Sequence, residues 1–263
     1  MIVALLNGRA GAGKTTLALH LAGAWVSGGD RVVLIDADPA QDALRWHETR
    51  LRAGLPARFR VLPAAPERLD RRTLRRIGRR FDRLIIDGPS GDVAHSLPAL
   101  LACDLAVIPT GPSAADMEAA QEMAGLAMSA RDLRPGLPVR FAFNRRSRGA
   151  DADREIADMR LEYEPALLDS AVGENAVFAE LAAAGHLLHD VESDAAARRE
   201  IAALAVEIGA IPISAGPPVS IVDRLLHPWL ASAPHRRGAS NAGAAATGEC
   251  ASDVALPADG GGS

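Results

Sequence analysis

Residues 8–16 have the composition of a phosphate-binding loop. They fit the pattern G-x-x-x-x-G-K-[ST], and they lie after an apolar run and before a helical one. Glycines let backbone amides curl around phosphate oxygens, and the ammonium of Lys14 can reach the β and γ phosphates of a nucleotide. A glycine-rich turn without a ligand is the alternative. We expect these residues to bind the nucleotide: Gly8, Arg9, Ala10, Gly11, Ala12, Gly13, Lys14, Thr15 and Thr16.

Lys14 is the only lysine among the 29 lysine and arginine residues. The chain therefore uses arginine at every other basic position. A compact ammonium on a flexible stem can do what a planar guanidinium cannot. The lysine at this one position supports direct contact with phosphate.

Three aspartates end apolar, strand-like runs. Asp36 and Asp38 follow one run, and Asp87 ends another. The carboxyl ends of parallel strands meet at one edge of a sheet, where such sheets bind ligands. Asp36 and Asp38 are two residues apart and point the same way, so one can support a metal while the other orients an attacking water. A solvated Asp-Pro turn is the alternative at Asp38. We expect Thr15 and Asp87 to hold Mg²⁺.

The spacing of apolar residues predicts alternating strands and helices, which is typical of a parallel sheet covered on both faces. We therefore predict an α/β fold with a mostly parallel, doubly wound sheet of the P-loop NTPase type, flanked by helices. Strands are expected at residues 2–6, 31–35, 59–62, 83–86, 105–108, 139–143 and 166–168. Helices are expected at residues 14–26, 41–52, 67–80, 114–130, 151–162, 175–184 and 195–208.

The overall composition argues against several classes of protein. Hydrophobic residues make up 48% of 263 residues, enough for a buried core, yet no apolar run approaches the roughly 20 residues of a membrane helix. Cys103 and Cys250 form no disulfide framework or metal-ligand pair. The net charge of −4 argues against coating nucleic acid through bulk charge. An apolar strand begins directly after Met1, which leaves no room for a signal peptide, so a cytoplasmic location is expected.

The composition changes after residue 210. We expect a P-loop ATPase domain over residues 1–210 and a C-terminal extension with a short amphipathic segment over residues 211–231. Ala, Gly and Ser dominate residues 232–263, which contain too few large apolar groups to fold alone. We expect disorder there.

Five sequence blocks occur in the order typical of the ParA/MinD family, the P-loop ATPases with a deviant Walker A motif. They lie at residues 7–16, 36–41, 85–89, 104–116 and 141–144. The chain resembles in particular the short ParA-type partition proteins, over residues 1–210. The resemblance implies ATP and Mg²⁺ as cofactors and a homodimer that forms on ATP binding.

The resemblance also implies a role for individual residues. Lys14 would contact the phosphates, and Asp38 would position the hydrolytic water. Thr15 and Asp87 would hold Mg²⁺, and we assign Asp36 to the metal with them. Asn144 matches the asparagine that reads adenine in the family, although a strand-end asparagine is also a common turn former.

Arg9 stands where the family has a signature lysine that crosses the dimer to the partner's nucleotide. An arginine could act there in trans, because its planar fork binds phosphate through two contacts. Ala10 replaces a family glycine, which narrows the conformations open to the loop. The alternative is that Arg9 is a solvated loop residue.

The resemblance implies partition of DNA, of a plasmid or a chromosome, by a slow ATPase that a dimer and a centromere-binding adaptor protein stimulate. Nonspecific DNA binding would need a basic surface. A solvated charged face is the alternative for the first of two candidate clusters. One cluster comprises Arg68, Arg71, Arg72, Arg75, Arg76, Arg79 and Arg80; the other comprises Arg145, Arg146, Arg148, Arg198 and Arg199.

Two alternative functions remain open from the sequence. A related ATPase could position a protein assembly or the division or motility machinery instead of DNA. A membrane-bound member of that kind is not expected, because the tail ends in Gly and Ser rather than an amphipathic helix. A P-loop enzyme acting on a small metabolite is the other alternative, for which no substrate pocket can be identified.

Overall fold

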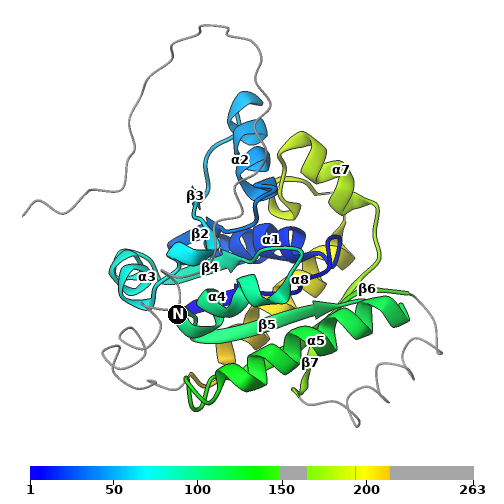
Figure 1. The fold of residues 1–263 in the computed structure, drawn as a ribbon. Coiled ribbons are helices and arrows are strands. Elements are labelled where there is room, and N and C mark those ends of the chain that lie inside the picture. Colours follow the sequence, from blue (N-terminus) through cyan, green and yellow to red (C-terminus); the bar gives the residue numbers. More distant parts are fainter. Residues whose placement is uncertain (148–164, 193, 214–263) are drawn as a thin grey trace, which may run out of the picture.

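The computed structural model describes residues 1–147, 165–192 and 194–213. A seven-stranded parallel sheet lies between two layers of helices (Figure 1). Its strand order is β3-β2-β4-β1-β5-β6-β7. This confirms the predicted α/β fold. The strands are β1 (Ile2–Leu5), β2 (Val32–Asp36), β3 (Arg60–Pro63), β4 (Arg83–Asp87), β5 (Leu105–Thr110), β6 (Val139–Arg146) and β7 (Leu167–Gly173).

The helices cover both faces of the sheet. One buried cluster joins the sheet to α1, α2, α7 and α8, and a second joins it to α3, α4 and α5. Strands β1, β2 and β5 are buried along their whole length, which explains why they are continuous apolar runs rather than alternating ones. The helices are α1 (Lys14–Ser27), α2 (Asp42–Arg52), α3 (Arg71–Gly78), α4 (Leu97–Ala102), α5 (Ala114–Ala130), α7 (Val177–Ala184) and α8 (Ala195–Ala210).

The helix predicted over residues 67–80 is wrong in its first turn. The chain forms a short 3₁₀ turn, η1 (Pro66–Arg68), and then an extended residue, Leu69. Asp70 follows and accepts a hydrogen bond from the Thr73 amide at 2.8 Å, which caps the start of α3. An aspartate in this place ends one helix and starts another, because its side chain satisfies an amide that has no partner within the helix.

Helix α4 was not predicted. Its six residues are almost entirely apolar, and a short run without periodicity does not distinguish a helix from a strand. The helix predicted at residues 151–162 lies outside the described residues, as do residues 214–231 of the predicted extension and the predicted tail at residues 232–263. None of the described helices is long and apolar enough to cross a bilayer.

The order of the strands brings the predicted site residues together. Strand β1 lies between β4 and β5, and the chain winds outward from it in both directions. In the register of the sheet Leu5 lies beside Asp87, and Asp87 beside Asp36. The loop after β1 therefore begins next to both aspartates, at the edge where open parallel sheets bind ligands.

Candidate nucleotide-binding site

The loop after β1 ends in a helix start that has no cap of its own. Gly13 has a φ of 93°, in the left-handed region, and no side chain caps α1. The first amides of α1 are thus without a helical partner and suit an anion. Asn144 packs closely here, since a Cβ on Gly13 would lie 2.0 Å from its Nδ2. A glycine is therefore required at position 13.

Lys14 is buried at the first position of α1. Its Nζ donates to Ser90 Oγ at 2.8 Å and to the Arg9 carbonyl at 3.3 Å. Burial lowers the pKa of Lys14, and the negative charges of Asp87 and Asp38 oppose that shift. A phosphate would replace these weak partners with a full negative charge.

Asp87 is buried completely at the end of β4. Neither carboxylate oxygen has a hydrogen bond of normal geometry among the described residues. Burial raises the pKa of Asp87 to about 8, and Asp36 and Asp38 add to the rise, while the neighbouring Thr15 hydroxyl and Lys14 partly offset it. A buried carboxyl without a partner is costly in a protein interior. A hydrated cation would supply the positive charge and the hydrogen-bond donors that the Asp87 carboxylate lacks.

The other two aspartates are held by backbone amides. Asp36 accepts from the amides of Asp38 at 3.2 Å and Leu44 at 2.9 Å, so it fixes the turn after β2 and the start of α2. Burial raises the pKa of Asp36 despite these hydrogen bonds. Asp38 accepts from the Ala40 amide at 2.9 Å and from the Ser90 hydroxyl at 2.6 Å.

These residues fit a nucleotide with Mg²⁺. No group of three or more His, Cys, Asp or Glu side chains in the described part of the chain forms a ready metal centre. A cation at Asp87 would therefore need phosphate and water oxygens to complete its shell, which is how Mg²⁺ is usually bound at phosphate sites. The partnerless carboxyl of Asp87, beside Thr15 and Lys14, is the observation that supports this fit.

Comparisons with known proteins agree with this site. Residues 3–215 match the family model "CobQ/CobB/MinD/ParA nucleotide binding domain". The chain belongs to this family. A curated relative, maintenance of carboxysome distribution protein A from Gloeobacter kilaueensis, is 36% identical over 118 residues, which are 44% of this chain and 51% of the relative. The chromosome-partitioning ATPase Soj from Thermus thermophilus is 30% identical over 166 residues, 53% of this chain and 65% of Soj.

Solved structures of the family share the fold. The cell division ATPase MinD from Pyrococcus furiosus superposes with a TM-score of 0.62 at 19% identity, over 79% of this chain and 98% of MinD. An ATP complex of McdA from Cyanothece gives a TM-score of 0.66 at 16% identity, over 81% of this chain and 98% of McdA. The chain thus spans nearly the whole of these structures but only half to two thirds of the curated relatives it matches.

Asn144, the family's expected adenine reader, lies against the phosphate loop. Its Nδ2 donates to the Ala12 carbonyl at 3.1 Å, and the side chain is buried. The position at the end of β6 is therefore next to the nucleotide site, and contact with adenine stays a prediction.

Arg9 forms an ion pair within its own chain. Its Nε lies 3.0 Å from Asp116 Oδ1, and Arg145 Nη2 lies 2.6 Å from the same oxygen. Asp116 also closes a capping box with Ser113 at the start of α5. Burial opposes ionisation of Asp116, but the hydrogen bond from Ser113 and the charge of Arg145 outweigh it, so its pKa lies below the usual range. Arg9 remains 42% exposed.

Three residues of the site were not predicted from the sequence. Ser90 joins Lys14 to Asp38, and Asp116 holds Arg9. Asn7 ties the loop to β5, because it donates to the Pro109 carbonyl and accepts from the Arg9 amide, both at 2.8 Å. Asn7 and Asp116 lie within the five family blocks and Ser90 directly follows the third, which was the only signal that could have indicated them.

The structure changes both predicted basic clusters. Arg71 is buried and lies 3.4 Å from Asp104, so it belongs to the core, and Arg68 lies outside α3. In the second cluster Arg145 pairs with Asp116, and Arg146 with Glu200 at 3.9 Å. Arg198 donates to the Val191 carbonyl, and Arg148 lies outside the described residues. The exposed arginines of the first cluster are Arg68, Arg72, Arg75, Arg76, Arg79 and Arg80.

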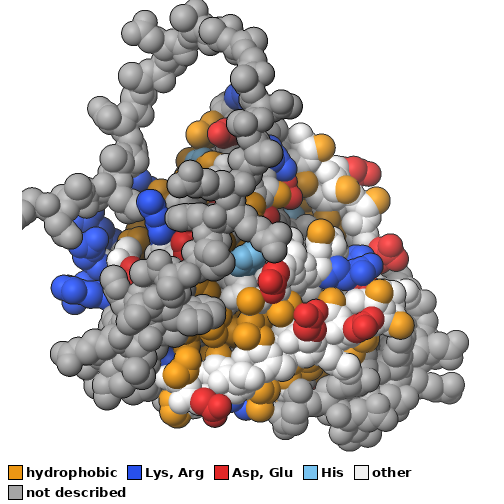
Figure 2. Space-filling model, in the orientation of Figure 1, with side chains coloured by type: hydrophobic (Ala, Val, Ile, Leu, Met, Phe, Trp, Pro, Cys, Tyr) orange, Lys and Arg blue, Asp and Glu red, His pale blue; other side chains and the backbone are white. Residues whose placement is uncertain are grey.

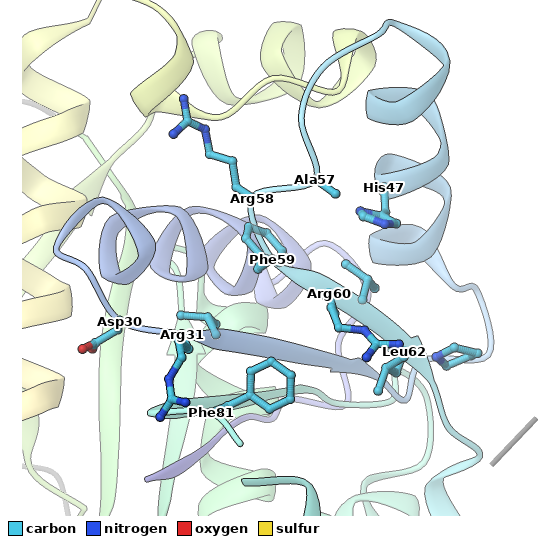
Figure 3. A pocket seen from close by; sticks show the side chains of 12 residues that line it. Asp30, Arg31, His47, Ala57, Arg58, Phe59, Arg60, Leu62 and Phe81 are labelled. Carbon is cyan, nitrogen blue, oxygen red and sulfur yellow. The ribbon is translucent and has the colours of Figure 1, made fainter. Parts of the chain in front are cut away.

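An open groove of about 580 Å³ lies along the edge strand β3 (Figure 3). None of its lining residues belongs to the phosphate loop. Arg31 in its wall pairs with Asp82, and Arg58 with Asp190, so much of its positive charge is neutralised. The groove is separate from the nucleotide site.

Proposed function

We propose that the chain binds and hydrolyses ATP with Mg²⁺, dimerises on ATP binding and uses this cycle to partition DNA. The observation that carries the proposal is the meeting of three features at one sheet edge. These are the uncapped start of α1, the buried ammonium of Lys14 and the partnerless carboxyl of Asp87. Together they match the charge pattern of a nucleotide phosphate with its cation.

Each residue then has a task in hydrolysis. Backbone amides of residues 8–16 cradle the phosphates, and Lys14 neutralises them. Thr15, Asp36 and Asp87 would hold Mg²⁺, which would supply positive charge to the phosphates. Asp38 orients the water whose oxygen attacks the γ phosphorus. The bond from the γ phosphorus to the bridging oxygen breaks, and the water's proton passes to a phosphate oxygen, leaving ADP and inorganic phosphate.

Arg9 would complete this site in a second copy of the chain. The side chain is half exposed on the loop, and its present partner, Asp116, is already satisfied by Arg145 and Ser113. If Arg9 leaves Asp116, the carboxylate therefore keeps its bonds to Arg145 and Ser113. A guanidinium that reaches the partner's phosphates stabilises the charge that develops in the transition state.

The exposed arginines of η1 and α3 form the surface that we propose for DNA. In Figure 2 basic side chains gather at the left, over α3. The apolar residues Leu69 and Leu74 point into the core, so this surface lacks the apolar face that a membrane helix needs. Such a surface would bind the phosphate backbone without reading sequence. DNA would sit away from the phosphate loop, because α3 is anchored to Asp104 at the amino end of β5.

A second candidate function keeps the ATPase and changes the cargo. The relative with 36% identity is a maintenance of carboxysome distribution protein, whereas Soj is a chromosome-partitioning ATPase. Positioning of a protein assembly through an adaptor protein is therefore the alternative.

Binding of duplex DNA of unrelated sequence, with and without ATP·Mg²⁺ at low salt, tests the proposal. Wild-type protein should bind only with ATP, and Lys14→Ala should bind neither ATP nor DNA. Loss of ATP binding in Lys14→Ala with no DNA binding in the wild type would favour the assembly-positioning alternative. Tight ATP binding by Lys14→Ala would contradict the site itself.

A further inference from the structure

Ser90 connects the two residues on which the proposed hydrolysis depends. Its hydroxyl oxygen lies 2.8 Å from Lys14 Nζ and 2.6 Å from Asp38 Oδ2. An ammonium only donates hydrogen bonds, so the Ser90 oxygen must accept from Lys14. The single hydroxyl hydrogen is then left for Asp38. The direction of both hydrogen bonds is thereby fixed.

The segment that carries Ser90 is hydrogen-bonded to β1 on one side of the serine and to the phosphate loop on the other. The Gly88 amide donates to the Leu5 carbonyl at 3.0 Å, and the Gly91 amide donates to the Gly8 carbonyl at 2.7 Å. The approach at Gly88 is so close that a Cβ there would lie 2.7 Å from the Leu5 carbonyl oxygen. Ser90 is therefore held at a fixed place relative to the loop, whereas Asp38 belongs to a separate turn after β2.

A bound phosphate competes with Ser90 for the ammonium of Lys14, which has three N–H donors and uses two of them on Ser90 and the Arg9 carbonyl. A phosphate oxygen carries negative charge and forms a stronger hydrogen bond with an ammonium than a neutral hydroxyl does. If the ammonium moves from Ser90 to the phosphates, the Ser90 oxygen loses that donor but keeps its bond to Asp38. Its freed lone pair faces the space between Lys14 and Asp38 and can accept a hydrogen bond from water.

We propose that Ser90 is a positioning residue for ATP hydrolysis, which holds Lys14 before the nucleotide arrives and afterwards orients the Asp38 carboxylate and the attacking water. The inference rests on the proposed ATPase function. It assigns Ser90 no bond to the nucleotide. Its loss should therefore slow turnover without weakening ATP binding.

The test compares Ser90→Ala and Ser90→Thr with a matched control, Ser129→Ala, whose hydroxyl bonds only to its own helix on the exposed side of α5. ATP affinity is measured with a fluorescent ATP analogue, and turnover is measured at saturating ATP·Mg²⁺. For Ser90→Ala we expect kcat to fall about 10-fold, which corresponds to one lost positioning contact, with the dissociation constant within about 2-fold of wild type. Ser90→Thr keeps the hydroxyl and should recover most of kcat.

A second comparison separates positioning from folding. In an Asp38→Asn background, adding Ser90→Ala should slow turnover no further, because the carboxylate that Ser90 orients is already gone. Wild-type kcat in Ser90→Ala would overturn the proposal while leaving the ATPase intact, as would equal losses in affinity and kcat or an additive double variant. A wild-type protein that binds ATP but does not hydrolyse it would overturn the proposed function, and this inference with it.

Discussion

Arg9 Nε lies 3.0 Å from Asp116 Oδ1 of the same chain, so the residue proposed to act across a dimer is held by an intramolecular ion pair. Asp116 belongs to the capping box of α5 and also holds Arg145. The arrangement ties the phosphate loop to the start of α5 before a partner is present. Formation of the dimer would then exchange this ion pair for phosphate of the partner's nucleotide.

Arg9→Ala should bind ATP but turn it over at least about 100-fold more slowly than wild type, because a trans-acting arginine stabilises charge that appears in the transition state. ATP affinity and kcat, measured on the same preparations, check this. Arg9→Lys keeps a cation on the loop and should recover part of the rate. Unchanged kcat in Arg9→Ala would contradict a role in trans and leave Arg9 only its ion pair with Asp116.

Asp87→Asn should change how stability depends on pH in the absence of nucleotide. Burial raises the pKa of Asp87 to about 8, so the folded protein retains a proton that the unfolded chain releases near pH 4. Stability from this group therefore falls as pH rises from about 4 to about 8. In urea unfolding at several pH values, the free energy of unfolding of Asp87→Asn should rise relative to that of the wild type as pH increases across that range.

The same carboxyl must lose its proton to hold Mg²⁺, so the Mg²⁺ affinity of the ATP-bound wild type should rise between pH 6 and pH 8.5. Asp87→Asn should bind Mg²⁺ weakly at every pH in that range. In the urea-unfolding comparison, a difference in stability between the wild type and Asp87→Asn that does not vary with pH would contradict the raised pKa of Asp87.

Asp104→Ala should destabilise the fold by about 3–5 kcal/mol, because it leaves buried guanidinium groups without their carboxylate. Asp104 accepts from the Ile2 amide at 2.9 Å and pairs with Arg71, Arg75 and Arg134. Asp82→Ala is the control, since the Arg31–Asp82 pair is exposed and screened by solvent, so its loss should cost far less stability than the loss of Asp104. Similar losses in chemical unfolding of both variants would contradict a buried anchor for α3.

Arg72→Ala/Arg76→Ala should weaken DNA binding and reduce the slope of log affinity against log salt by about 1 to 2, as expected for two lost phosphate contacts. The matched control is Arg45→Ala/Arg52→Ala, which removes the same charge from exposed positions on α2. Both double variants should hydrolyse ATP as the wild type does in the absence of DNA. Equal weakening of DNA binding by both would show that net charge, and not the α3 surface, is responsible.

The sequence predicted those parts of the site that depend on short-range patterns. The phosphate loop and the aspartates at strand ends are each recognisable within a few residues, and the parallel sheet then brings them to one edge. Ser90 and Asp116 were missed because their roles depend on contacts with residues far away in the sequence. Ser90 contacts Lys14, 76 positions earlier, and Asp116 contacts Arg9, 107 positions earlier. The local sequence around a serine or aspartate in a loop does not indicate such a distant partner.

The arginine clusters show a second reason why sequence was insufficient. Spacing predicted a single basic helix over residues 67–80, but Asp70 caps a new helix there, and Asp104 draws Arg71 into the core. A buried acid elsewhere in the chain decides which arginines remain exposed. Charge alone does not say which face of a helix is anchored.

ATP at the phosphate loop is expected to convert one chain into a dimer with a complete site. Light scattering of the protein with Mg²⁺ and a non-hydrolysable ATP analogue tests it most directly. We predict a mass near 27.5 kDa without nucleotide or with ADP, and about twice that mass with the analogue. Lys14→Ala should remain monomeric in all conditions. A wild-type mass that stays the same in every nucleotide state, although the analogue is bound, would contradict the account.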